Sequence, residues 1–333
     1  MAEGERLDGL SRIRSLPEFA QIVFPGSSLA KASDFQRESV SELVRELSGF
    51  LVHVPESGAR FLESVLARFQ VENVKVLLRI IIARTYEGDL PHYIVPVPRE
   101  AALNVRELAA AESLEDFVRL TPKGLIRNSL RKALEMYHGF SQPFFFEAAL
   151  DQAYFQELIA GVGELPEEDR EIVKPMACQE ADIFHLMLTL RGKFNYGLTR
   201  EMLLPLHVAG TRIPRSLFAE MLGDTDPRAA VDRAVGRALD TALPEGESGN
   251  ETVPQVVFGG VVERLAWKRF LRLANLAFRR SHMGLGAIVG YAGLRRVEVA
   301  NLITVSEGIE RGVDAETIRA HLIRGTEVEA VHV

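Results

Sequence analysis

The stretch LRRVEVANLITVSEGIERGVDAETIRAHLI, from Leu294 to Ile323, decides how the rest of the chain is interpreted. Its apolar residues recur at helical spacing until Gly312, and Asp314 stands where a second helix would begin. Glycine commonly ends one helix, and an aspartate side chain commonly caps the next. The stretch is therefore predicted to form two helices joined by a tight turn. Such a hairpin is either a DNA-binding helix-turn-helix or one copy of a repeated structural unit.

Two other segments share the pattern of EVANLITVSEG, which spans 298–308. They are DIFHLMLTLRG at 182–192 and QVENVKVLLRI at 70–80, and all three align on Asn73, His185 and Asn301. These three positions are 112 and 116 residues apart. In each copy a polar residue lies three positions earlier, an aliphatic residue follows directly, and a charged residue lies six positions later. Two nearly equal steps favour an internal repeat.

The segments that follow the copies agree with this interpretation. After the second copy comes YGLTREMLLPL, and after the third comes RGVDAETIRAHLI. Each has a glycine, then Thr199 or Asp314 in a capping position, with Glu201 or Glu316 close behind. In the first copy EGDLPHYIVP is a degraded version. Helix, glycine, cap and short helix are thus predicted three times.

Helical periodicity dominates the remaining sequence, so the predicted fold is all-α. HYIVPVP, at 92–98, is the only strand-like piece, and its prolines favour an extended loop. The repeat divides the chain into three predicted helical domains at 1–125, 126–242 and 243–333. LPEGESGNETVPQ, at 243–255, is the most linker-like segment.

With its repeats in this order, the chain resembles the C subunit of V-type and A-type rotary ATPases, known as the d subunit in eukaryotic V-ATPases. EVANLITVSEGIERGVDAETIRAHLI matches the family's recurring pattern best, and ADIFHLMLTLRGKFNYGLTREMLL matches second best. FEAALDQAYFQEL, at 146–158, is similar to a central segment of the family. The resemblance covers nearly the whole chain.

The resemblance implies three similar helical bundles arranged as a funnel with pseudo-threefold symmetry. It also implies a non-catalytic central-rotor subunit, peripheral on the cytoplasmic face of a membrane and held there through protein partners. The expected partners are the central stalk subunits and the membrane rotor ring, which would move H⁺ or Na⁺. No cofactor is expected.

The chemistry-bearing residues agree with a non-enzymatic protein. None of the eight histidines has the spacing of a zinc-binding helix, and no acid/base constellation or phosphate-binding motif can be assembled. Gly284, Gly286 and Gly290 resemble a dinucleotide fingerprint, but a helix precedes them where a strand is required, so close helix packing is the better interpretation. Asn73, Asn301 and His185 are predicted to form structural hydrogen bonds.

One segment concentrates positive charge, at 263–282, and it contains the candidate partner contacts. They are Arg264, Lys268, Arg272, Arg279 and Arg280, with Arg269 counted beside them. Two interpretations stay open. The segment is a solvated helix face, or it contacts acidic partner helices or anionic lipid headgroups.

The alternative function is a DNA-binding or regulatory helical protein that uses 294–323 as its helix-turn-helix. Its second helix would offer only Arg319 and His321 to the bases, and Asp314 and Glu316 would face phosphate. The net charge of −7 also disfavours phosphate binding, so no nucleic-acid partner is expected. No apolar run reaches the length of a membrane-spanning helix.

Overall fold

The computed structural model describes residues 4–83, 94–97, 103–136, 143–241, 255–281 and 284–325. Helices make up nearly all regular structure in these ranges, and the β-type pairing seen there is a single isolated bridge between Val235 and Leu239. The all-α prediction is confirmed. Ile94–Val97 has no regular structure, as predicted for that loop, and the rest of HYIVPVP lies outside the described residues.

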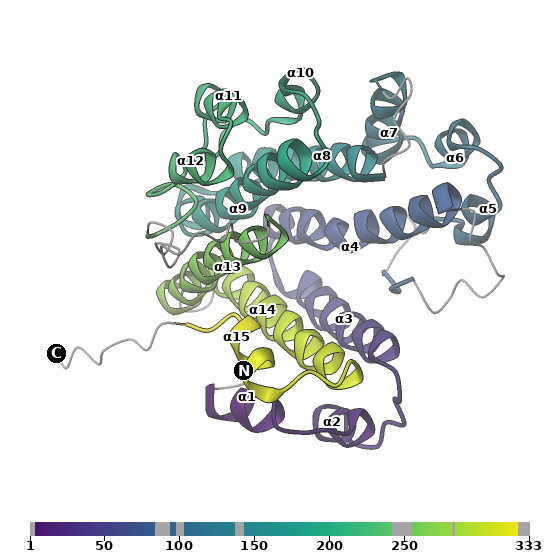
Figure 1. The fold of residues 1–333 in the computed structure, drawn as a ribbon, viewed down its shortest axis with the longest axis vertical. Helices are drawn as coiled ribbons and strands as arrows, with labels where there is room; N and C mark the ends of the chain where they lie inside the picture. Colours follow the sequence, from purple (N-terminus) through teal and green to yellow (C-terminus); the bar gives the residue numbers. More distant parts are fainter. Residues whose placement is uncertain are drawn as a thin grey trace.

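Six long helices form three consecutive pairs (Figure 1). The pairs are α3 (Ala32–Gly49) with α4 (Glu56–Ala83), α8 (Pro143–Gly163) with α9 (Glu167–Met187), and α13 (Gln255–Arg280) with α14 (Leu285–Glu310). A π-helical segment, η3 (Leu188–Asn195), extends α9.

Shorter helices occupy the remaining described segments. They are α1 (Gly4–Leu10), α2 (Leu16–Val23), the 3₁₀ turn η1 (Phe50–His53), α5 (Val105–Ala109), α6 (Leu114–Leu120), α7 (Leu125–Met136), α10 (Arg200–Leu203), the 3₁₀ turn η4 (Leu204–Leu206), α11 (Arg215–Gly223), α12 (Pro227–Asp232) and α15 (Ala315–His321).

The first helices of the three pairs bury matching stripes. Four residues spaced by one helical turn are buried in each helix, so they form one apolar face. They are Phe35, Ser39, Leu43 and Leu47 in α3, Phe146, Leu150, Tyr154 and Leu158 in α8, and Val262, Ala266, Phe270 and Ala274 in α13. These stripes are offset by 111 and then 116 residues, close to the steps found from the sequence.

The pairs contact one another in a closed order. The second helix of each pair packs on the first helix of the next: α4 on α8, α9 on α13, and α14 back on α3 (Figure 1). A funnel of three bundles would give this order, although the funnel itself stays a prediction. The predicted domain limits also remain predictions. The limit at 125/126 falls in the first turn of α7, and the limit at 242/243 lies in 242–254, outside the described residues.

The aligned residues Asn73, His185 and Asn301 play the same role in the three pairs. The Asn73 amide donates to the Val95 carbonyl at 2.9 Å and accepts from the Val95 N–H at 3.0 Å. Asn301 makes the same two bonds to Ile323, both at 2.8 Å. His185 Nε2 accepts from the Val208 N–H at 3.0 Å.

These three partners lie 22, 22 and 23 residues after Asn73, Asn301 and His185. Each polar side chain therefore ties a helix to backbone that lies 22 or 23 residues further along the chain, and we call these contacts the clamps. The predicted structural role is confirmed for all three residues.

The turns after the second and third copies agree with the prediction in part. Gly197 and Gly312 adopt φ values of 65° and 68°, which favour glycine. Asp314 caps α15, because its carboxylate accepts from the Glu316 and Thr317 N–H groups at 2.9 Å. Thr199 stands at the N-cap of α10, as predicted, but its side chain makes no cap bond there.

Two of the three glycines of the fingerprint-like sequence, Gly286 and Gly290, serve helix packing, whereas Gly284 is the exposed N-cap of α14. A Cβ atom at Gly290 would lie 2.5 Å from the Phe278 nitrogen, so α13 and α14 approach closely there. At Gly286 a Cβ would lie 2.6 Å from Ile172 Cγ2. This confirms close packing as the reason for both residues.

Candidate partner-binding cavity

A cavity of about 290 Å³ lies where five of the long helices meet, and we call it the charged hollow. Its wall comes from α4, α8, α9 with its extension η3, α13 and α14, and thus from all three helix pairs. The wall contains five cationic and five acidic side chains. They are Arg68, Lys75, Arg79, Arg191 and Arg296, and Glu72, Glu147, Asp151, Glu180 and Glu263.

Two equivalent ion pairs join neighbouring helix pairs at this wall. Arg79 Nε lies 2.6 Å from Glu147 Oε1, and Arg191 Nη2 lies 2.5 Å from Glu263 Oε2. The third equivalent position is Glu307, which pairs with Arg311 at 3.5 Å. Ion pairs at these repeat positions therefore join the first helix pair to the second and the second to the third, but not the third to the first.

Deeper in the hollow, three equivalent residues come from the second helices: Arg68, Glu180 and Arg296. Arg296 Nη1 lies 2.7 Å from Glu180 Oε1, and the guanidinium also lies 5.7 Å from the centre of the Trp267 ring. The single acid among the three thus lies beside cations, and an arginine in its place would be repelled by them. Beyond this layer the same helices meet on apolar residues around a void of about 20 Å³.

Neighbouring opposite charges favour the charged forms of Glu72 and Arg68 in the hollow. Lys75 Nζ lies 2.6 Å and Arg68 Nη1 lies 2.8 Å from Asp151 Oδ1. Burial alone would raise the pKa of Glu72, but Arg68 and Lys75 outweigh it and that pKa is lowered. Burial alone would lower the pKa of Arg68, yet Asp151 and Glu72 raise it. The wall is therefore a fixed array of opposite charges.

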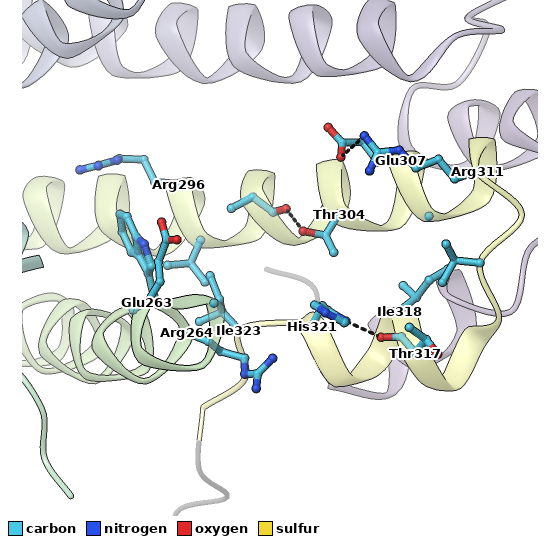
Figure 2. A pocket seen from close by; sticks show the side chains of 16 residues that line it. Glu263, Arg264, Arg296, Thr304, Glu307, Arg311, Thr317, Ile318, His321 and Ile323 are labelled. Carbon is cyan, nitrogen blue, oxygen red and sulfur yellow. Dashed lines mark hydrogen bonds and ion pairs between the residues drawn. The ribbon is translucent and has the colours of Figure 1, made fainter. Parts of the chain in front are cut away.

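A second cavity, of about 590 Å³, opens between α13, α14 and α15, and we call it the C-terminal groove (Figure 2). Its apolar surface includes Val297, Ile318 and Ile323. Charged and polar side chains surround this surface. They are Glu263, Arg264, Arg296, Thr304, Glu307, Arg311, Thr317 and His321. Glu263, Trp267 and Arg296 also line the charged hollow, so the two cavities adjoin each other.

The structure separates the five predicted contact residues along α13. Arg264 lies on the C-terminal groove and donates to the Ala320 carbonyl at 2.9 Å. Arg272 pairs with Asp240 at 2.8 Å. Lys268 is exposed, and Arg279 and Arg280 are exposed at the end of the helix. The five residues therefore do not form one compact patch.

The sequence interpretation grouped Arg269 with this basic segment, and the structure corrects that assignment. Its side chain is buried, donates to Gln179 Oε1 at 2.7 Å and pairs with Asp240. The reason is its position beside Phe270, on the face of α13 that packs on α9. Arg269 is a structural residue of the helix interface.

The sequence interpretation missed the charged hollow. One signal was present, because Arg79 and Arg191 occupy the same repeat position and Glu147 and Glu263 are also one repeat step apart. Pairing these two sets requires knowing that each second helix packs on the next first helix. Lys75 and Asp151 have no comparable signal.

Comparison with known proteins agrees with this architecture. The family model described as "ATP synthase (C/AC39) subunit" matches residues 23–321. The chain belongs to this family. The match runs from the end of α2 to the end of α15 and includes every residue that lines the charged hollow, as well as all those that line the C-terminal groove except Ile323.

Two curated relatives in the family are similar over most of their length. The C subunit of the A-type ATP synthase of Methanothermobacter thermautotrophicus is 25% identical over 297 residues, covering 88% of this chain and 74% of the relative. The C subunit of the A-type ATP synthase of Methanocaldococcus jannaschii is 21% identical over 328 residues, covering 97% and 80%.

Two further findings apply to the described residues. None of their helices combines the length and the apolar character needed to cross a bilayer. The same residues contain no group of three or more histidine, cysteine or acidic side chains arranged to hold a metal ion.

Proposed function

We propose that this family member is the non-catalytic central-rotor subunit of a V/A-type ATPase. It sits on the cytoplasmic face of a membrane and couples the central stalk to the membrane rotor ring, which moves H⁺ or Na⁺. The observation that supports this proposal is the charged hollow, walled by all three helix pairs in a chain whose family model covers residues 23–321. In this proposal the three pairs form the funnel, and the hollow receives the foot of the stalk.

The wall of the hollow suits a part that transmits torque. Opposite charges paired across a helix junction oppose sliding of one helix past another, because sliding would move the paired groups apart. The Arg79–Glu147 and Arg191–Glu263 pairs lie at such junctions. The subunit would then rotate as one body and pass the stalk's rotation to the ring.

Reconstitution tests the proposal. The purified chain is mixed with the central stalk subunits of the same ATPase, and complex mass is measured by light scattering after gel filtration. A stoichiometric complex is expected, and the stalk-bound chain should then join the detergent-solubilised rotor ring. A duplex DNA mobility-shift series at increasing salt runs in parallel. DNA binding at physiological salt without stalk binding would support the helix-turn-helix alternative and overturn the proposal.

A further inference from the structure

We propose that the C-terminal groove is a socket that binds one large apolar side chain of the central stalk, preferably an aromatic one. A carboxylate of the stalk would lie beside that side chain. This inference rests on the proposed function and deepens it. It assigns a particular contact to one of the three helix pairs, the third, where the groove lies between α13, α14 and α15 (Figure 2).

The second helix pair shows what fits such a space. Three of its bulky side chains stand at positions where the third pair has small ones: Phe144, Phe184 and Leu188 correspond to Gly260, Ala300 and Thr304. Phe144 lies with its ring 4.7 Å from that of Tyr196, and a Cβ at the adjacent Gly192 would lie 3.1 Å from Phe144 Cε1. The second pair therefore fills this region with its own aromatic ring.

The third pair leaves the corresponding region open. Apart from Gly260 itself, its chain neighbours and the backbone of its own helix, no atom of the described residues lies within 4 Å of a Cβ built at Gly260, and both Gly260 and Ala300 are exposed. Glycine inside a helix costs about 0.5–1 kcal/mol relative to alanine. Helix stability thus does not explain why residue 260 is a glycine, whereas the need for space for a partner's side chain would explain it.

The charges around the groove indicate which group of the stalk would lie next to the bound apolar side chain. Glu307 is paired with Arg311, and Arg296 with Glu180. Among the described residues no carboxylate pairs with Arg264, whose guanidinium is bonded to a backbone carbonyl. A partner carboxylate would supply the missing charge, because an arginine binds a carboxylate through two parallel hydrogen bonds.

The position of the groove selects the stalk as the partner. The groove shares Glu263, Trp267 and Arg296 with the charged hollow, so a stalk seated in the hollow would reach it without leaving the surface. Ile323 on the wall of the groove is half-buried in this structure, and an occupant of the socket would cover it further.

Filling the groove from within tests the inference. Gly260→Phe restores the residue type of the second pair, and Gly260→Ala is its matched control, because it changes helix propensity without filling the space. The affinity of each variant for the purified stalk complex is measured by calorimetry at fixed salt. We expect Gly260→Phe to weaken binding at least tenfold and Gly260→Ala to bind like the unaltered chain. Thermal unfolding verifies that both are folded, and Ala300→Phe blocks the same space from α14.

Charge variants of Arg264 test the proposed stalk carboxylate. Arg264→Glu should weaken stalk binding about tenfold or more and Arg264→Lys should retain most of it. Equal affinities for the filled and unfilled variants would overturn the socket while leaving the proposed function intact. Failure of the unaltered chain itself to bind the stalk would instead overturn the proposed function.

Discussion

The hairpins at His185 and Asn301 occupy the same place in two copies of the repeat, yet they are held differently. Asn301 both donates to and accepts from the Ile323 backbone, whereas His185 accepts one bond from Val208. A neutral imidazole has one donor and one acceptor nitrogen, and His185 Nδ1 has no hydrogen-bond partner within 3.5 Å. The comparison shows that a repeat preserves the position of a backbone contact more strictly than its chemistry.

Removing the Asn301 clamp should have the largest effect. Asn301→Ala leaves both backbone groups of Ile323 without their partner in a site where the side chain is 3% exposed. Unsatisfied buried groups cost about 1–3 kcal/mol each. We therefore expect the free energy of unfolding in urea to fall by about 2–4 kcal/mol.

The control for this prediction lies one turn away on the same helix. Thr304 is half-buried, and its hydroxyl donates to the Ala300 carbonyl within α14. Thr304→Ala should change the free energy of unfolding by less than about 0.5 kcal/mol. A similar small loss for Asn301→Ala would show that the clamp does not hold the hairpin.

The caps provide a second contrast between the two hairpins. Asp314→Ala removes an acceptor for two N–H groups of α15 and should cost about 1 kcal/mol. Thr199→Ala should cost clearly less, because the Thr199 side chain caps no N–H group. Thermal unfolding of both variants at pH 7 measures the difference, and equal losses would contradict it.

The clamps also differ in how they respond to pH. Burial lowers the pKa of His185, and Asp182, whose Oδ1 lies 3.7 Å from Nδ1, opposes this only in part; the stacked His207 ring lowers it further. In the unfolded chain a histidine takes up its proton near pH 6.5. The unfolded state therefore binds more protons below that pH, and stability falls as pH decreases from about 7.

His185→Asn should remove this contribution, which is at most about 1.4 kcal/mol per pH unit for one proton. The measurement is the slope of unfolding free energy against pH between 5 and 7.5 for both proteins. Slopes, and not absolute stabilities, are compared, because asparagine also loses the ring contacts with His207 and Phe218. Identical slopes would show that His185 does not titrate on unfolding.

Local patterns predicted a large part of this fold. Helical spacing located the long helices, and the steps of 112 and 116 residues located the clamps, because both depend on residues near in sequence or on self-similarity. The position of Thr199 at an N-cap was predictable, but the absence of its cap bond was not, because a hydroxyl has several partners within reach. Arg269 was misplaced because its side chain reaches Gln179, 90 residues away.

The charged hollow was out of reach for the same reason. Lys75 and Asp151 are 76 residues apart, and Arg68 and Asp151 are 83 apart, so neither pairing follows from periodicity. The C-terminal groove is open because positions 260 and 300 carry the small residues Gly260 and Ala300 and no bulky side chains. A small residue signals an opening only after its neighbours in space are known.

Trp267 is the single tryptophan of the chain and lies on the boundary between the charged hollow and the C-terminal groove. Indole emission depends on the polarity around the ring, and the half-buried Trp267 side chain would lose water when either cavity is filled. The unlabelled protein therefore contains its own optical reporter at the proposed docking surface. Titration with a tryptophan-free partner would shift this emission, and the Arg296 guanidinium 5.7 Å from the ring would make the signal sensitive to rearrangement of the wall.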